Sequence, residues 1–98
     1  MKVGEMIRLI RTRKGISQRD MAEKLRITSN YLSLIEANKK IPGRDIISDF
    51  AEKIGISNAA LLFAVSDVPD ELGEKDKNDF LKLQSNIIHL LLFNSKNG

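Results

Sequence analysis

The sequence contains no cysteine, no tryptophan and only one histidine among its 98 residues. The absence of cysteine excludes disulfides, iron–sulfur clusters, thiolate zinc sites and cysteine nucleophiles. With one histidine and no cysteine, a transition metal would have almost only carboxylates as ligands. We therefore expect no metal site and no cofactor. No apolar run approaches the roughly 20 residues of a membrane helix, and the N-terminal MKVGEMIRLIRTRKG has no continuous apolar core, so we expect no signal peptide. The protein expected from these absences is soluble and cytoplasmic.

The residues that are present have the composition of one folded domain with unevenly placed charge. Apolar residues make up 42% of the chain and charged residues 30%, which is too apolar for a disordered protein. Residues 1–57 hold 12 Lys and Arg against 7 Asp and Glu, whereas residues 58–98 hold 4 against 6. A basic first part on a chain of net charge +3 favours an anionic partner, although solvated helix faces would give the same counts.

Apolar residues recur at helical spacing along the chain, and no segment alternates as a strand does. The pattern predicts an all-α protein. Ser17, Thr28 and Ser57 are suited to cap helices at their starts, and Gly15 and Gly55 to end them. The predicted helices cover Val3–Lys14, Gln18–Arg26, Ser29–Ala37, Arg44–Ile54, 58–65 and Asp79–Phe93. The chain is thus divided into a five-helix domain over 1–65, an acidic linker over 66–78 and a C-terminal apolar helix within 79–98.

The second and third predicted helices are separated by only two or three residues, Arg26, Ile27 and Thr28. A connection this short makes the two helices cross steeply instead of lying antiparallel. That arrangement is a helix-turn-helix, in which the second helix of the pair can enter the major groove of DNA. The spacing therefore favours a nucleic-acid-binding unit in the first part of the chain, although short helix pairs are common in other proteins.

The residues of this region are more specific than their spacing. The informative stretches are ISQRDMAEKL over 16–25, Ile27-Thr28, YLSLIE over 31–36, Pro42 and IGIS over 54–57. With these stretches in this order, residues 5–64 resemble the phage repressor/Cro class of bacterial and phage helix-turn-helix regulators, also known as the xenobiotic response element family. The resemblance implies a repressor-like domain that binds a palindromic operator on double-stranded DNA as a homodimer, with its third helix in the major groove.

The resemblance also implies contacts with DNA for individual residues. The base contacts it implies are made by Ser29, Asn30, Ser33 and Leu34. Asn30 is the best candidate for direct readout, because a carboxamide pairs bidentately with adenine, and Leu34 suits a thymine methyl. The phosphate contacts it implies are made by Gln18, Arg19, Tyr31, Lys39, Lys40 and Arg44. An ordinary solvated surface would contain the same residue types.

The same resemblance implies structural roles for three further residues. Arg11 and Glu36 stand where the family has a partly buried ion pair that holds the third helix at its angle. Arg26 departs from the family pattern, because the turn often has glycine at this position in a left-handed conformation. A residue other than glycine costs roughly 1 kcal/mol there.

The C-terminal helix has an apolar arc of about 200°, twice the width needed to pack on one surface. This width predicts one face for the helix's own domain and another for a second copy of the chain. Gln84 lies within the arc, where a polar residue can fix the register of a dimer, and His89 lies on the polar side as an exposed residue. The expected dimerisation residues are Phe80, Leu83, Gln84, Ile87, Ile88 and Leu91. The alternative is that this helix only completes the core of the monomer.

Two other function classes fit the sequence less well than a DNA-binding regulator. An enzyme is not expected, because the sequence has no nucleophile–base pair, no glycine-rich phosphate loop and no HExxH motif, and no small-molecule ligand is evident. An antitoxin or antagonist module that acts through protein binding by the C-terminal helix is the stronger alternative. Co-purification with a second small protein would distinguish it from a homodimeric regulator.

Overall fold

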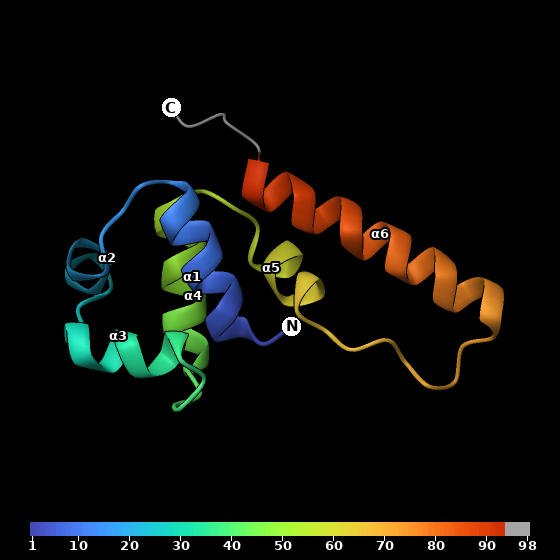
Figure 1. The fold of residues 1–98 in the computed structure, drawn as a ribbon, viewed down its shortest axis with the longest axis horizontal. Coiled ribbons are helices and arrows are strands. Elements are labelled where there is room, and N and C mark those ends of the chain that lie inside the picture. The colour runs from blue at the N-terminus through green and yellow to red at the C-terminus, as the bar shows by residue number, and fades with distance from the viewer. Residues whose placement is uncertain (94–98) are drawn as a thin grey trace.

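The computed structural model describes residues 1–93, and over this range it consists of helices and connecting loops without a strand (Figure 1). The all-α prediction is therefore confirmed for the described part of the chain. The last five residues of the predicted C-terminal segment, 94–98, lie outside it. The helices are α1 (Val3–Arg13), α2 (Gln18–Leu25), α3 (Ser29–Glu36), α4 (Arg44–Ile54), α5 (Asn58–Ala64) and α6 (Glu74–Phe93).

Three helices begin at the hydroxyl residues that the sequence marked as caps. Ser17 Oγ accepts a hydrogen bond from the Asp20 amide at 3.0 Å, and Thr28 Oγ1 accepts one from the Tyr31 amide at 3.0 Å. Ser57 Oγ accepts one from the Ala60 amide at 3.1 Å. Each bond satisfies a backbone donor that has no partner inside its helix. These local bonds fix where α2, α3 and α5 start.

The turn between α2 and α3 depends on one strained residue. Arg26 ends α2 with φ 58° and ψ 41°, which is the left-handed conformation expected at this position. Ile27 then donates its amide to the Ala22 carbonyl at 3.0 Å and closes the turn. Arg26 is exposed and makes no ion pair within residues 1–93. The expected strain is therefore present, and no ionic contact inside the described chain offsets it.

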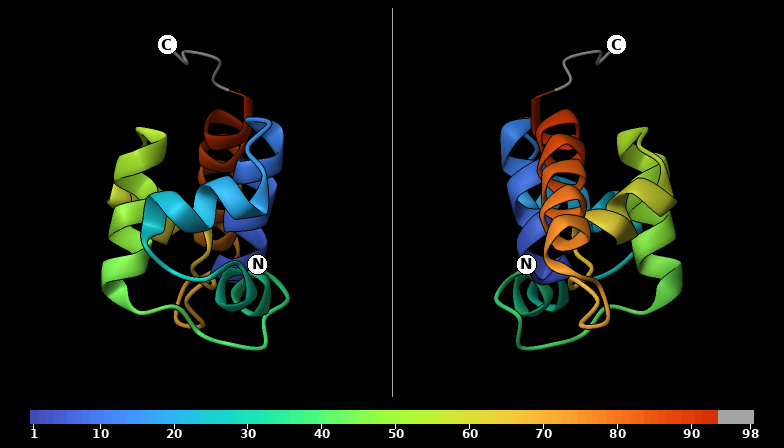
Figure 2. Two further views of the ribbon diagram at one scale, coloured as in Figure 1. Left: turned by 90° about the vertical axis from the view of Figure 1, so that its left-hand side faces the viewer. Right: turned by 90° about the vertical axis from the view of Figure 1, so that its right-hand side faces the viewer.

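All six helices contribute to a single hydrophobic core. The fully buried side chains at its centre are Met6, Ile7, Ile10, Met21, Leu32, Ile35, Phe50 and Leu61. Leu91 of α6 joins them with 8% of its surface exposed. Figure 2 shows α1 and α4 on opposite sides of this core, with α2 crossing between them. The outer faces of α2 and α3 are left free.

Gly4 permits close contact between α1 and the end of α3. A Cβ atom at this position would overlap the backbone carbonyl oxygen of Ile35, which cannot move aside as a flexible side chain would. Gly4 lies in the first turn of α1 and is buried. Since no larger residue fits, the α1–α3 packing distance depends on this glycine.

The C-terminal helix begins earlier than the sequence indicated. We expected it to start at residue 79, whereas α6 starts at Glu74. Glu74 and Asp76 lie in its first turn, where negative charge is favourable beside the helix dipole. The acidic composition that resembled a linker is therefore partly a helix start. None of the helices within residues 1–93 is long and apolar enough to cross a membrane.

α6 packs along α5 and α1, as both views of Figure 2 show. The rings of Phe63 and Phe80 lie 5.1 Å apart, and the guanidinium of Arg13 lies 4.2 Å above the ring of Phe93. Gln84 Nε2 donates to the carbonyls of Phe63 at 3.1 Å and of Ser66 at 2.7 Å. Gln84 thus satisfies carbonyls at the end of α5 within its own chain.

Replacement of Arg26 by glycine should stabilise the protein. Glycine adopts the left-handed conformation without a Cβ clash, so Arg26→Gly should raise the free energy of unfolding by about 1 kcal/mol. Lys24→Gly is the matched control, because Lys24 lies in the right-handed last turn of α2. This variant should have a free energy of unfolding about 0.5–1 kcal/mol lower than the wild type. Urea denaturation measures both. An Arg26→Gly variant no more stable than the wild type would show that the turn is unstrained.

Candidate nucleic-acid interface

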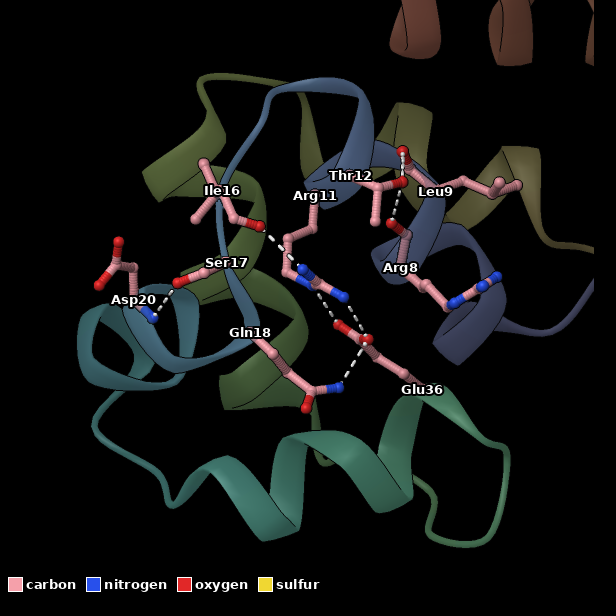
Figure 3. A network of polar contacts seen from close by, with 9 residues as sticks. All are labelled: Arg8, Leu9, Arg11, Thr12, Ile16, Ser17, Gln18, Asp20 and Glu36. Carbon is pink, nitrogen blue, oxygen red and sulfur yellow. Dashed lines mark hydrogen bonds and ion pairs between the residues drawn. The ribbon is translucent and has the colours of Figure 1, made fainter.

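A buried network of polar side chains joins the start of α2, the end of α3 and α1 (Figure 3). Arg11 donates to both carboxylate oxygens of Glu36, from Nε to Oε2 at 2.7 Å and from Nη2 to Oε1 at 2.8 Å. Its Nη1 donates to the Ile16 carbonyl at 2.8 Å. Arg11 is 9% exposed and Glu36 is 5% exposed. The pair that the resemblance implied is therefore formed, and its geometry is bidentate.

This ion pair determines how α3 is held. Arg11 lies on α1, which is fixed in the core, whereas Glu36 is the last residue of α3. A two-point guanidinium–carboxylate contact restrains both distance and orientation. Within residues 1–93 no buried side-chain nitrogen or oxygen lacks a hydrogen bond, so burial of these charges is compensated.

Gln18 belongs to the same network. It is the first residue of α2, and its Nε2 donates to Glu36 Oε1 at 3.0 Å. Neither a phosphate ligand nor an exposed polar residue, the two roles that the sequence suggests for Gln18, includes this contact. A carboxamide nitrogen carries two N–H groups, and the contact with Glu36 uses one of them. The start of α2 and the end of α3 are thus linked through one carboxylate.

α3 buries one side and presents the other to solvent. Leu32 and Ile35 are completely buried, whereas three of the four predicted base contacts, Ser29, Asn30 and Ser33, are exposed. Leu34, the fourth, is half-buried. The helix lies at the edge of the molecule in Figure 1. An α-helix with its side chains is about 10–12 Å in diameter, which matches the roughly 12 Å width of the B-DNA major groove.

The loop after α3 is folded back onto that helix. The amides of Lys39 and Lys40 both donate to the Leu34 carbonyl, at 2.8 and 3.2 Å. Asn38 turns the chain with φ 63°, in the left-handed region that asparagine tolerates. Pro42 is buried at the end of the loop. The loop therefore has a defined position at the C-terminal end of α3.

Apart from Tyr31, the predicted phosphate ligands belong to the elements that precede and follow α3 in the chain. Arg19 on α2, Lys39 and Lys40 in the loop, and Arg44 at the start of α4 are all exposed. No ion pair within residues 1–93 involves any of these four cations. Tyr31 differs from them, because it is half-buried and packs against the core. Of the predicted phosphate ligands, those available to an anion are thus the four cations and the remaining N–H of Gln18.

One exposed residue beside α3 was missed. Ile41, between Lys40 and Pro42, has 91% of its surface exposed. Among the large apolar residues whose exposure is described, the next is Leu90 at 56%. The signal in the sequence is a single apolar residue in an otherwise polar loop. Helical periodicity identifies buried positions within helices, and it therefore gives no information on Ile41.

The residues predicted for dimerisation are placed unequally on α6. Leu91 is buried, and Ile87 and Ile88 are half-buried against the core. Phe80 and Gln84 are half-buried against Phe63 of α5. Leu83 is 54% exposed. Leu81 and Leu90 were not among the predicted residues but are also exposed, at 48% and 56%. The wide apolar arc therefore has a central stripe that completes the core and exposed flanks.

Loss of one partner of the ion pair should destabilise the fold. Glu36→Ala leaves the Arg11 charge buried without a counter-ion and should lower the free energy of unfolding by about 3–5 kcal/mol. The double variant Arg11→Met, Glu36→Leu is the control, because an apolar pair of similar volume carries no unpaired charge and should recover much of that loss. Thermal denaturation of the three proteins measures the effect. A double variant as unstable as Glu36→Ala would contradict this explanation.

Comparison with known proteins agrees with this geometry. A family model described as a helix-turn-helix domain matches residues 4–68, about two thirds of the chain. No curated protein and no solved structure matches the sequence. The matched range contains α1 from its second residue, all of α2 to α5, the buried Arg11–Glu36 pair and the exposed face of α3. The chain therefore belongs to the helix-turn-helix domain family, whose members are DNA-binding regulators.

Proposed function

We propose that this protein is a transcriptional repressor that binds a palindromic operator as a homodimer, with α3 of each copy in the major groove. The observation that carries the proposal is the exposed face of α3 beside unpaired cations, held in place by the Arg11–Glu36 pair. A rigid polar helix face reads base edges, and the surrounding cations neutralise phosphates. The matched family supports DNA as the partner.

Asn30 is the principal candidate for direct readout. It is exposed in the first turn of α3, the part of a recognition helix that meets base edges. Its carboxamide can accept from adenine N6 and donate to N7, a pairing that distinguishes adenine from the other bases in the major groove. Ser29 and Ser33 provide hydroxyls on the same face, and the half-buried Leu34 provides an apolar contact for a thymine methyl.

The cations around α3 anchor the helix to the backbone. Arg19 and Gln18 lie at the N-terminus of α2, and Arg44 lies at the N-terminus of α4. Helix N-termini direct backbone N–H groups and positive potential toward an anion. Lys39 and Lys40 complete the set from the loop. Two helix starts and one loop then fix the protein on the duplex while α3 reads the sequence.

The distribution of charge gives the molecule an orientation. The segment from Asp67 to Asp79 contains six acidic residues and two lysines. Figure 1 places this segment at one end of the longest axis, and α2 and α3 at the other. A duplex is attracted to the basic end and repelled from the acidic end, so the approach that presents α3 is favoured.

The homodimer is proposed to form through the exposed flank of α6. Leu83 and Leu90 are two helical turns apart and therefore lie on the same side of the helix, with the half-buried Ile87 between them. Two such stripes related by a twofold axis can bury each other. The same axis would direct two α3 helices to half-sites about 34 Å apart, and a dimer bound over a promoter would exclude polymerase.

Substitutions of a base contact and of a phosphate contact should affect DNA binding in different ways. On a duplex enriched from random sequence, Asn30→Ala should weaken binding by about 1–3 kcal/mol and leave binding to unrelated DNA unchanged. Lys39→Ala should weaken binding to both and lower the slope of log K against log salt by about 0.9. Fluorescence anisotropy between about 50 and 200 mM salt measures both quantities. A salt-independent affinity of the wild type would contradict the proposed function.

The oligomeric state should depend on the exposed leucines of α6. Leu83→Glu with Leu90→Glu should convert a dimer into a monomer, because the carboxylates would be buried without partners in the interface. Ser85→Glu, at an exposed polar position on the same helix, is the control and should remain dimeric. Sedimentation equilibrium measures the mass. A wild-type monomer that associates only with a second, different protein would instead support the antitoxin alternative.

A further inference from the structure

A groove lies on the surface between α4 and α5, two helices that pack against each other (Figure 2). Its lining residues are Arg44, Ile47 and Ser48 of α4 and Asn58 and Leu62 of α5. Residues three or four positions apart lie on the same face of a helix, so each helix contributes one stripe. No motif in the sequence marks the groove, because its residues come from two helices that are adjacent only after folding.

The size and lining of the α4–α5 groove suit a small molecule. Its volume is about 430 Å³, within the range of about 300–1,000 Å³ that is typical of ligand pockets. Ile47 is half-buried and Leu62 has 45% of its surface exposed, so both helices offer apolar surface to a ligand. Ser48 and Asn58 are exposed and provide a hydroxyl and a carboxamide. Apolar surface with a few polar groups is the usual composition of a small-molecule site.

The charge of the groove indicates the class of ligand. Within residues 1–93, Arg44 is the only charged residue that lines the groove, and the three acidic residues of α4 do not line it. No ion pair in that range involves Arg44, so its guanidinium is available to an anion. A carboxylate can bind a guanidinium through two parallel hydrogen bonds. An organic acid with an apolar body therefore complements the groove in both polarity and charge.

We propose that the α4–α5 groove binds a small apolar carboxylic acid, with its carboxylate on Arg44 and its hydrocarbon body between Ile47 and Leu62. Because Arg44 is also a proposed phosphate ligand, the acid and the DNA backbone compete for one guanidinium. The acid is then an effector that weakens DNA binding, and the duplex weakens binding of the acid by the same factor. This regulation rests on the proposed DNA-binding function, whereas binding of the acid to the free protein does not.

Titration of the isotope-labelled full chain with sodium hexanoate tests the groove without DNA. In two-dimensional NMR spectra the largest amide shifts should occur in α4 and α5, with half-saturation at about 1 mM. Hexanol has the same hydrocarbon body without the charge and should bind about tenfold more weakly, because it makes no charge-assisted bond. Sodium acetate has the charge without the body and should cause little shift at the same concentration.

Variants separate the contribution of the charge from that of the apolar surface. Arg44→Gln should reduce the affinity for hexanoate about tenfold, to that for hexanol, and Leu62→Ala should reduce it about threefold through lost apolar contact. Lys53→Gln, at the opposite end of α4, is the control for charge. Leu81→Ala is the control for apolar surface, because Leu81 on α6 is 48% exposed. Both controls should bind hexanoate as the wild type does.

Fluorescence anisotropy with a labelled duplex of mixed sequence measures the competition at constant ionic strength. Hexanoate at about ten times its half-saturation concentration should weaken duplex binding about threefold relative to acetate, which is the effect of one lost phosphate contact. Leu62 is not a proposed DNA contact. Leu62→Ala should therefore bind the duplex as the wild type does without hexanoate, and it should respond less when hexanoate is added.

The outcomes separate the two proposals. A protein that binds hexanoate in the α4–α5 groove but does not bind the duplex at any salt contradicts the DNA-binding function and leaves the groove as a carboxylate site. An absence of shifts with hexanoate, shifts that hexanol produces equally, or shifts that persist in Arg44→Gln overturn the carboxylate site. A wild type that binds both ligands, with neither affinity changed by the other ligand, overturns the competition for Arg44.

Discussion

The bidentate contact between Arg11 and Glu36 is the interaction on which the interface depends. α3 is only eight residues long, and its outer face has no packing partner within the described chain. Its orientation is set by Leu32 and Ile35 on one side and by Glu36 at its end. Because Gln18 bonds to the same carboxylate, the first residue of α2 is fixed relative to the last residue of α3. A buried ion pair of this kind contributes more to the relative orientation of the helices than to the net free energy of unfolding.

The arrangement of α1, α2 and α3 depends on the backbone at two positions, one of which is strained. Gly4 lets α1 approach the end of α3, which brings Arg11 and Glu36 onto adjacent helices of a tightly packed pair. Arg26 accepts a left-handed conformation so that α3 can follow α2 after a short turn. The inner faces of α2 and α3 are therefore specified by packing, and their outer faces remain available for recognition.

Most of the fold could be predicted from local signals, and the misses share a physical cause. Ser17, Thr28 and Ser57 act on neighbouring residues, so their caps were readable from the sequence. The bonds from Gln18 to Glu36 and from Gln84 to the end of α5 join distant residues, and they depend on how helices cross. The start of α6 was missed because acidic residues are common both in linkers and in first helical turns. The base and phosphate contacts were carried over from a family resemblance and remain predictions.

The most direct test of sequence-specific DNA binding is selection of bound fragments from a random duplex library, read by sequencing. A homodimer with α3 in the major groove predicts an enriched motif with twofold symmetry, whose half-sites are about one helical turn apart, roughly 34 Å. The Asn30→Ala protein should lose the preference at one position in each half-site. A library without enrichment, or one enriched equally by the wild type and by Asn30→Ala, would contradict readout by α3.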